Sequence, residues 1–164
     1  METQTHFIIF HLGDKLLAIH LESVEKIIPM VNILRPAGLP WVLEGLVNCA
    51  GEFIPLVKSE QVLGLEDCKH DLYSQILLLR MGGRKLGMIV NKVIDIIEFT
   101  PGKGQIFRVD NSLHNIIESE ILYQQNYYSL LNLDKLLLAK EMLAISEFET
   151  KIRERLLNLD GTKV

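Results

Sequence analysis

Short apolar runs joined by glycine-containing turns constrain the fold of this chain most. The stretch HFIIFHLGDKLLAIHL, residues 6–21, places two such runs on either side of Gly13-Asp14. The stretch SQILLLRMGGRKLGMIVNKVIDIIEF, residues 74–99, repeats the pattern around Gly82-Gly83, and a further hairpin is expected to turn near Gln125-Asn126. Strands this short and evenly spaced favour small β-barrels over a layered α/β sheet. We therefore predict a mainly β protein with two small barrels in tandem.

A polar segment interrupts this pattern and suggests how the chain is organised. The segment EDCKHDLYS, Glu66 to Ser74, is the best candidate for a crossing between two lobes. We expect a single domain over residues 1–164, with approximate lobes at 6–65 and 72–135. Whether the two lobes are intertwined is left open by the pattern.

The C-terminal region changes its period from that of strands to that of a helix. Asp134 is a suitable N-cap and Gly161 a suitable stop, which predicts a helix over residues 134–160. Apolar residues recur there at steps of three and four and form one stripe: Leu138, Met142, Ile145, Phe148, Ile152 and Leu156. We expect the stripe to dock on the chain's own barrels, with binding of a partner as the alternative.

The stretch EGLVNCAGEFIPLVKSE, Glu44 to Glu60, raises a question about strand edges. It indicates two apolar strands around a short turn, but Pro55 lies inside the second strand. Proline cannot donate to a central ladder, so it belongs at an edge or a bulge. Phe53 and Ile54 lie beside this edge, which must be covered either by the chain itself or by another protein.

The composition limits the classes of function. The chain is 48% hydrophobic and 23% charged, with a net charge of -4. Binding to nucleic acid through phosphates needs a basic surface, so we predict no nucleic-acid partner. No stretch provides the roughly 18 uncharged apolar residues of a membrane helix, so no direct membrane insertion is expected. The N-terminus METQTHF does not have the pattern of a secretory signal, which favours a cytoplasmic protein.

The side chains that carry catalysis are poorly placed for it. Cys49 and Cys68 lack CxxC spacing, and His70 lies in the polar crossing segment. The sequence contains neither HExxH nor a phosphate-binding glycine motif, and we predict no metal site and no cofactor. We expect an interaction module that is not an enzyme. The alternative is a small thiol-dependent enzyme that uses Cys49 or Cys68 with His70.

The order of several motifs resembles the CheW-like adaptor family of bacterial chemotaxis, from about Phe7 to Leu138. The segments are FHLGDKLLAIHLESVEKII, LPWVLEGLVNCAGEFIPLV, LGMIVNKVIDIIEF and SLLNLDKLLL. They follow the family's Gly-x-x-Asn-x-Arg-Gly-x-x-x-Pro and Gly-x-x-Val-Asp-x-Val patterns in order and spacing. The matching residues are Ile19, Val24, Ile27, Gly45, Asn48, Gly51, Pro55, Gly87, Val90, Val93, Leu133 and Asp134.

The resemblance implies a fold and a function. The fold is two intertwined five-stranded SH3-like β-barrels around a shared groove, with the C-terminal α-helix added. The function is that of a noncatalytic scaffold in chemotaxis or related two-component signal transduction. Its partners are the cytoplasmic tip of a chemoreceptor and the regulatory domain of a CheA-like histidine kinase. Candidate interface residues are Val24, Lys26, Ile28, Trp41, Ala50, Phe53, Ile54, Lys58, Met88 and Val90.

The chain departs from the family pattern at charged positions. Ala50 stands where the family has the arginine of Asn-x-Arg-Gly, and Lys26 stands where it has glutamate. Lys58-Ser59 replaces Asp-Leu, and Asn91 replaces aspartate. Loss of an arginine removes bidentate hydrogen bonding, and a reversed charge rejects a partner whose matching charge is positive. We therefore expect an adaptor with divergent partners of its own.

Overall fold

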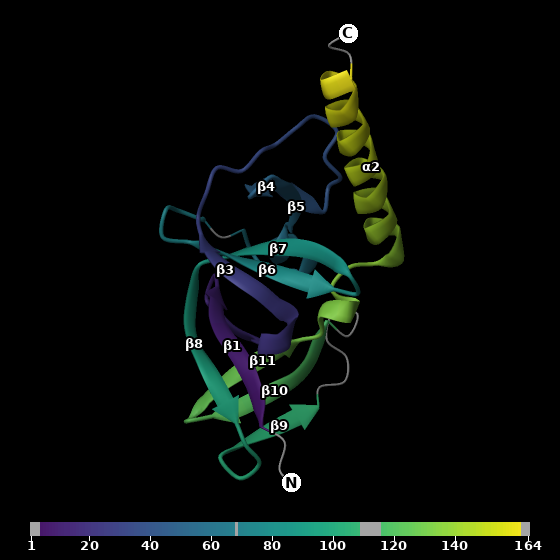
Figure 1. Ribbon diagram of the computed structural model, residues 1–164. Helices are drawn as coiled ribbons and strands as arrows, with labels where there is room; N and C mark the ends of the chain where they lie inside the picture. Colours follow the sequence, from purple (N-terminus) through teal and green to yellow (C-terminus); the bar gives the residue numbers. More distant parts are fainter. Residues whose placement is uncertain (1–3, 68, 109–115, 162–164) are drawn as a thin grey trace.

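The computed structural model describes residues 4–67, 69–108 and 116–161, and within these ranges the strands form two sheets (Figure 1). The first sheet has six strands in the order β8-β1-β2-β11-β10-β9. Their bounds are β1 Thr5–Leu12, β2 Lys15–His20, β8 Lys92–Phe99, β9 Gly104–Arg108, β10 Ile117–Tyr123 and β11 Asn126–Leu131.

The second sheet has five strands in the order β3-β6-β7-β5-β4. These strands are β3 Val24–Pro29, β4 Leu43–Cys49, β5 Glu52–Val57, β6 Gln75–Met81 and β7 Arg84–Val90. The helical segments are η1 Leu21–Ser23, α1 Ser59–Val62, η3 Leu133–Lys135 and α2 Ala139–Gly161. The prediction of a mainly β fold with a C-terminal helix is confirmed. The described strands form open sheets of six and five strands, whereas the resemblance implied five in each barrel.

The two sheets are interleaved along the chain. The first sheet takes its strands from both ends of the sequence, because β11 pairs in parallel with β2 through Ser129–Leu17 and Leu130–Ala18. The second sheet is built from the middle of the chain, β3 to β7. The approximate lobes 6–65 and 72–135 therefore do not coincide with the sheets. A pattern of local hairpins carries no information on this long-range parallel pairing.

The turns follow from the residues at their centres. Gly82 and Gly83 join β6 to β7 with positive φ values of 55° and 82°, and Gly13-Asp14 joins β1 to β2, both as predicted. In the Gly82-Gly83 turn, positive φ at both central residues is the signature of the type I′ hairpin turn. The β10–β11 turn uses Gln124 and Gln125, one residue earlier than predicted, because Asn126 already pairs with Tyr123.

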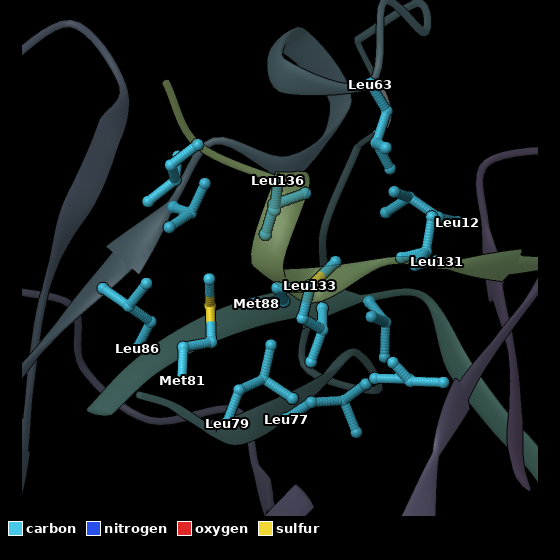
Figure 2. Packing of buried hydrophobic residues seen from close by; sticks show 14 of the residues in the cluster. Leu12, Leu63, Leu77, Leu79, Met81, Leu86, Met88, Leu131, Leu133 and Leu136 are labelled. Carbon is cyan, nitrogen blue, oxygen red and sulfur yellow. The ribbon is translucent and has the colours of Figure 1, made fainter. Parts of the chain in front are cut away.

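Alternation along the strands separates three apolar clusters. In β1, Phe7 and Ile9 point to one face of the first sheet, while Ile8 and Phe10 point to the other. The first pair belongs to a cluster on the first sheet alone, with Ile97 and other residues. The second pair enters a large cluster shared by both sheets, and Figure 2 shows its leucines and methionines from β6, β7, β11 and η3 packed together. A third cluster lies on the second sheet alone.

Helix α2 lies beside the second sheet and closes one side of the shared cluster (Figure 1). It begins at Ala139 and not at the predicted Asp134, because Leu133–Lys135 forms a 3-10 turn instead. Glu141 Oε1 accepts the backbone N–H of Leu138 at 2.8 Å, which is half of a capping box. Arg84 of β7 links the helix to the second sheet, because its guanidinium donates hydrogen bonds to Glu149 Oε1 at 3.1 Å and to Ser146 Oγ.

The predicted apolar stripe of α2 docks only through its middle. Ile145 and Phe148 are buried, with 0% and 6% of their surface exposed. Leu138 and Leu156, at the ends of the stripe, remain 43% and 39% exposed. Docking on the chain's own sheets is therefore confirmed for the central turns of the helix.

Gly45 in β4 is expected to tolerate no side chain. A Cβ there would lie 2.5 Å from Ile33 Cγ2 and 2.6 Å from the carbonyl oxygen of Leu34, which bridges to Leu46. Because backbone must shift to relieve this overlap, Gly45→Ala should lower the free energy of unfolding by about 1–3 kcal/mol. Urea denaturation measures the change, with Glu44→Ala as a neighbouring control that breaks only the exposed ion pair to Arg35. Equal stability of the two variants would contradict the close packing at Gly45.

Candidate functional site

The β4–β5 hairpin carries the tip at which the family motif falls. Ala50 and Gly51 form its turn with φ values of 52° and 88°, the type I′ geometry. The side chain of Asn48 stabilises this turn, because its Oδ1 accepts the backbone N–H of Gly51 at 2.8 Å. Ala50 is exposed at the tip.

The position of Pro55 answers the question about strand edges. Leu46 lies opposite Pro55, but its own N–H and C=O bond to Leu34 on the other side, each at 2.8 Å. The Leu46–Pro55 pair is therefore non-hydrogen-bonded, and the nitrogen of Pro55 points away from β4. On that side, the pairing of β5 with β7 covers only Leu56 and Val57 among the described residues. The first half of β5 is thus a local edge that accepts a proline.

A hollow of ≈ 380 Å³ lies where β3, one edge of the second sheet, faces the tip of the β4–β5 hairpin. We call it the seam groove. Residues of the third apolar cluster form part of its lining, and charged side chains accompany them. The lining residues are Glu25, Lys26, Ile28, Cys49, Ala50, Glu52, Ile54, Leu78 and Lys85. The structure thus brings together four of the predicted interface residues from β3 and the hairpin: Lys26, Ile28, Ala50 and Ile54.

Lys85 joins the two walls of the seam groove. Its Nζ lies 3.1 Å from Glu52 Oε2, beyond the hairpin tip, and 3.4 Å from Glu25 Oε1 on β3. Arg80 adds a contact of 3.5 Å to the same oxygen of Glu25. The hydrogen bond to Glu52, with the nearby charge of Glu25, raises the pKa of Lys85. Sequence reasoning missed Lys85, since β7 and the two carboxylates are far apart in the chain.

Lys26 has a different environment from Lys85. It is exposed on β3, next to Glu25. Among the residues that the structure describes, it is the one cation of the groove lining without an ion-pair partner. The groove therefore combines an apolar floor with one available positive charge.

Phe53 lies in a second hollow, of ≈ 300 Å³, between the hairpin and α2. The helix contributes Phe148, Ile152 and Leu156 to this hollow, so the half-buried Phe53 shares its lining with the chain's own helix. Sequence patterns gave no sign of this neighbour, because α2 reaches the hairpin only through the fold.

The other predicted interface residues lie elsewhere. Trp41 is 58% exposed on the loop before β4, and Lys58 is half-buried between β5 and α1. Val24 packs against the shared cluster. Met88 and Val90 have 0% of their surface exposed, because β7 is buried on both faces. Met88 and Val90 therefore have no surface available to a partner.

The geometry gives the thiol-enzyme alternative no support. His70 pairs through Nε2 with Glu60 Oε1 of α1, whereas Cys49 lines the seam groove. Cys68 lies outside the described residues. Within the described ranges, no group of three or more histidine, cysteine, aspartate or glutamate side chains is placed to hold a metal ion. Among those same residues, none of the helices combines the length and the hydrophobicity of a membrane span.

Comparison with known proteins places the chain in a family. The family model of the CheW-like domain matches residues 6–141, and the chain belongs to this family. The match ends at Glu141, within the first turn of α2. The resemblance found in the ordered sequence motifs is therefore confirmed.

Individual relatives are distant. The chemotaxis protein CheW of Klebsiella aerogenes is 26% identical over 94 residues, which are 57% of this chain and 57% of that protein. The CheW of Thermotoga maritima is 22% identical over 102 residues, 62% of this chain and 67% of that protein. The crystal structure of the scaffolding protein TtCheW from Thermoanaerobacter tengcongensis superposes with a TM-score of 0.74 at 22% identity, covering 86% of this chain and 94% of that one. This last likeness shows the fold.

Proposed function

We propose that this chain is a noncatalytic adaptor of the cytoplasm that couples a chemoreceptor to a CheA-type histidine kinase. The observation that carries the proposal is membership of the CheW-like family over residues 6–141. The relatives named above are chemotaxis proteins and a scaffolding protein. The available side chains fit a binding role, because the seam groove offers contact chemistry without a paired nucleophile and base.

Two separate surfaces support the coupling of two partners. The first is the seam groove at the hairpin tip, which we assign to the regulatory domain of the kinase. The second consists of exposed aliphatic side chains on the edge strand β8, Ile94 and Ile96, with 44% and 49% of their surface exposed. We assign this apolar surface to the helical tip of the receptor, since a helix binds through an apolar face.

The proposal is tested by titrating the full chain separately with the kinase regulatory domain and with a soluble receptor tip from the same host. We expect saturable binding of each, and simultaneous binding of both because the assigned surfaces are distinct. Ile96→Asp should weaken the receptor complex and leave the kinase complex unchanged. Absence of binding to both partners would overturn the proposal.

Trp41 and Phe53 are the aromatic candidates for hot spots. We expect Trp41→Ala to weaken one partner complex by about 1–3 kcal/mol and to leave the isolated protein folded, because its ring is mostly exposed. Phe53→Ala should also weaken binding by a similar amount, but with some loss of thermal stability because Phe53 lies against the α2 hollow. Calorimetric titration and thermal melts separate these effects. Unchanged binding with a large loss of stability would identify either residue as part of the core.

A further inference from the structure

The charges around the seam groove are arranged so that only one of them is available to a partner. Glu25 and Glu52 lie on opposite walls, and Lys85 contacts both carboxylates, at 3.4 and 3.1 Å. Arg80 contacts Glu25 as well. Both negative charges of the rim are thus neutralised inside the chain. Lys26 remains, exposed and adjacent to Glu25 on β3.

The lining beneath this charge is aliphatic. Ile54 and Leu78 are each 3% exposed, and Ile28 packs beside them in the third apolar cluster. The hollow of ≈ 380 Å³ is at the small end of the range for ligand pockets, about 300–1,000 Å³. A space of this size suits a few side chains of a docking segment, with an aliphatic group on the floor and a charge at the rim.

We propose that the seam groove binds an acidic segment of the kinase regulatory domain, in which an aspartate or glutamate pairs with Lys26 and a neighbouring aliphatic side chain covers the partly exposed Ile28. Lys26 is the specificity residue of this contact. Charge complementarity selects the occupant, because the rim offers one unpaired cation and no unpaired anion among the described residues. This inference rests on the proposed adaptor function and names the chemistry of its kinase contact.

Lys85 acts in this scheme as a positioning residue. It holds Glu25 and Glu52 in place, so neither carboxylate competes with the partner for Lys26. Without Lys85, Glu52 loses its ion-pair partner and Glu25 keeps only the 3.5 Å contact with Arg80, so the two carboxylates compete with the partner for Lys26. An acidic partner is then repelled even though Lys85 itself makes no contact with it.

The test is a titration of the full-length kinase regulatory domain with variants of the full chain at low and high salt. Lys26→Met should weaken binding about fivefold or more and flatten its salt dependence, and Lys26→Glu should weaken it further. Lys140→Met removes the same charge at an exposed position of α2 outside the groove and should change neither quantity.

The positioning role of Lys85 is tested by the kinase binding of two further variants. Lys85→Met should weaken binding, and the triple variant Lys85→Met, Glu25→Gln, Glu52→Gln should restore it, because the competing carboxylates are then gone. If the ion pairs of Lys85 with Glu25 and Glu52 only stabilise the fold, no such rescue is expected. Loss of binding in Lys85→Met without rescue would overturn the positioning assignment.

Different outcomes separate this inference from the proposed function. If the wild type binds the kinase domain and Lys26→Glu binds equally well, the groove assignment is wrong and the adaptor function stands. If the Lys26 variants lose the receptor tip and keep the kinase, the occupant has been assigned to the wrong partner. If the wild type binds neither partner, the proposed function fails and this inference fails with it.

Discussion

The double variant Ala50→Arg, Lys26→Glu should bind a standard CheA regulatory domain that the wild type binds poorly. The family has arginine and glutamate at these positions, and a reversed charge in a close interfacial pair can cost several kcal/mol. Both residues line the seam groove, so the two substitutions act on one surface. Ala50 is exposed with a φ of 52°, a conformation that arginine adopts at the same backbone cost as alanine. The fold should therefore tolerate the change.

Calorimetric titration of the wild type, both single variants and the double variant against the standard domain measures this gain. The matching titration against the host's own CheA-like kinase should show the opposite trend, with the double variant weaker than the wild type. Tight binding of the wild type to the standard domain, with no gain in the double variant, would refute the idea of divergent partners.

Phe148→Ala should lower the free energy of unfolding by about 3–5 kcal/mol, the range for truncation of a buried phenylalanine. Its side chain is 6% exposed and belongs to the cluster shared by both sheets. The truncation therefore leaves a cavity where α2 packs against this cluster. Because α2 lies mostly beyond the family match at residues 6–141, this experiment asks whether the added helix is part of the folding unit.

Chemical denaturation of the wild type and Phe148→Ala gives the difference directly. Leu157→Ala is the matched control on the same helix, since its side chain is 65% exposed and its loss should cost no more than about 0.5 kcal/mol. If Phe148→Ala is as stable as this control, then α2 contributes little to the fold and its docking is not an integral contact.

Local features of this fold could be predicted because neighbouring residues determine them. Gly82-Gly83 supplies the positive φ values of its turn, and the spacing of Ile145 and Phe148 places both on the buried face of α2. The parallel pairing of Ser129 with Leu17 could not be predicted, since no local pattern registers strands so far apart. Helix α2 starts later than predicted because Asp134 lies in a 3-10 turn, where its N–H donates to Asn132 Oδ1.

In the candidate site, too, the sequence motifs predicted some residues, while others became apparent only from the fold. The ordered motifs pointed to Ala50 and Lys26 before their proximity was known, because the family pattern marks them. Met88 fits the same strand pattern, but burial on both faces of β7 removes it from the surface, which alternation alone does not reveal. Lys85 carries no motif and acquires its role only when β7 lies between Glu25 and Glu52.

Coupling itself is tested most directly by reconstituting the kinase with receptor-containing membranes of the host, with and without this chain, and measuring kinase autophosphorylation. We predict that the chain changes receptor-dependent kinase activity severalfold and makes that activity respond to the receptor's ligand. Ile96→Asp, which alters the assigned receptor surface, and Lys26→Glu, which alters the assigned kinase surface, should each abolish the effect. Kinase activity that is the same with and without the chain, in the presence of a functional receptor and kinase, would contradict the adaptor function.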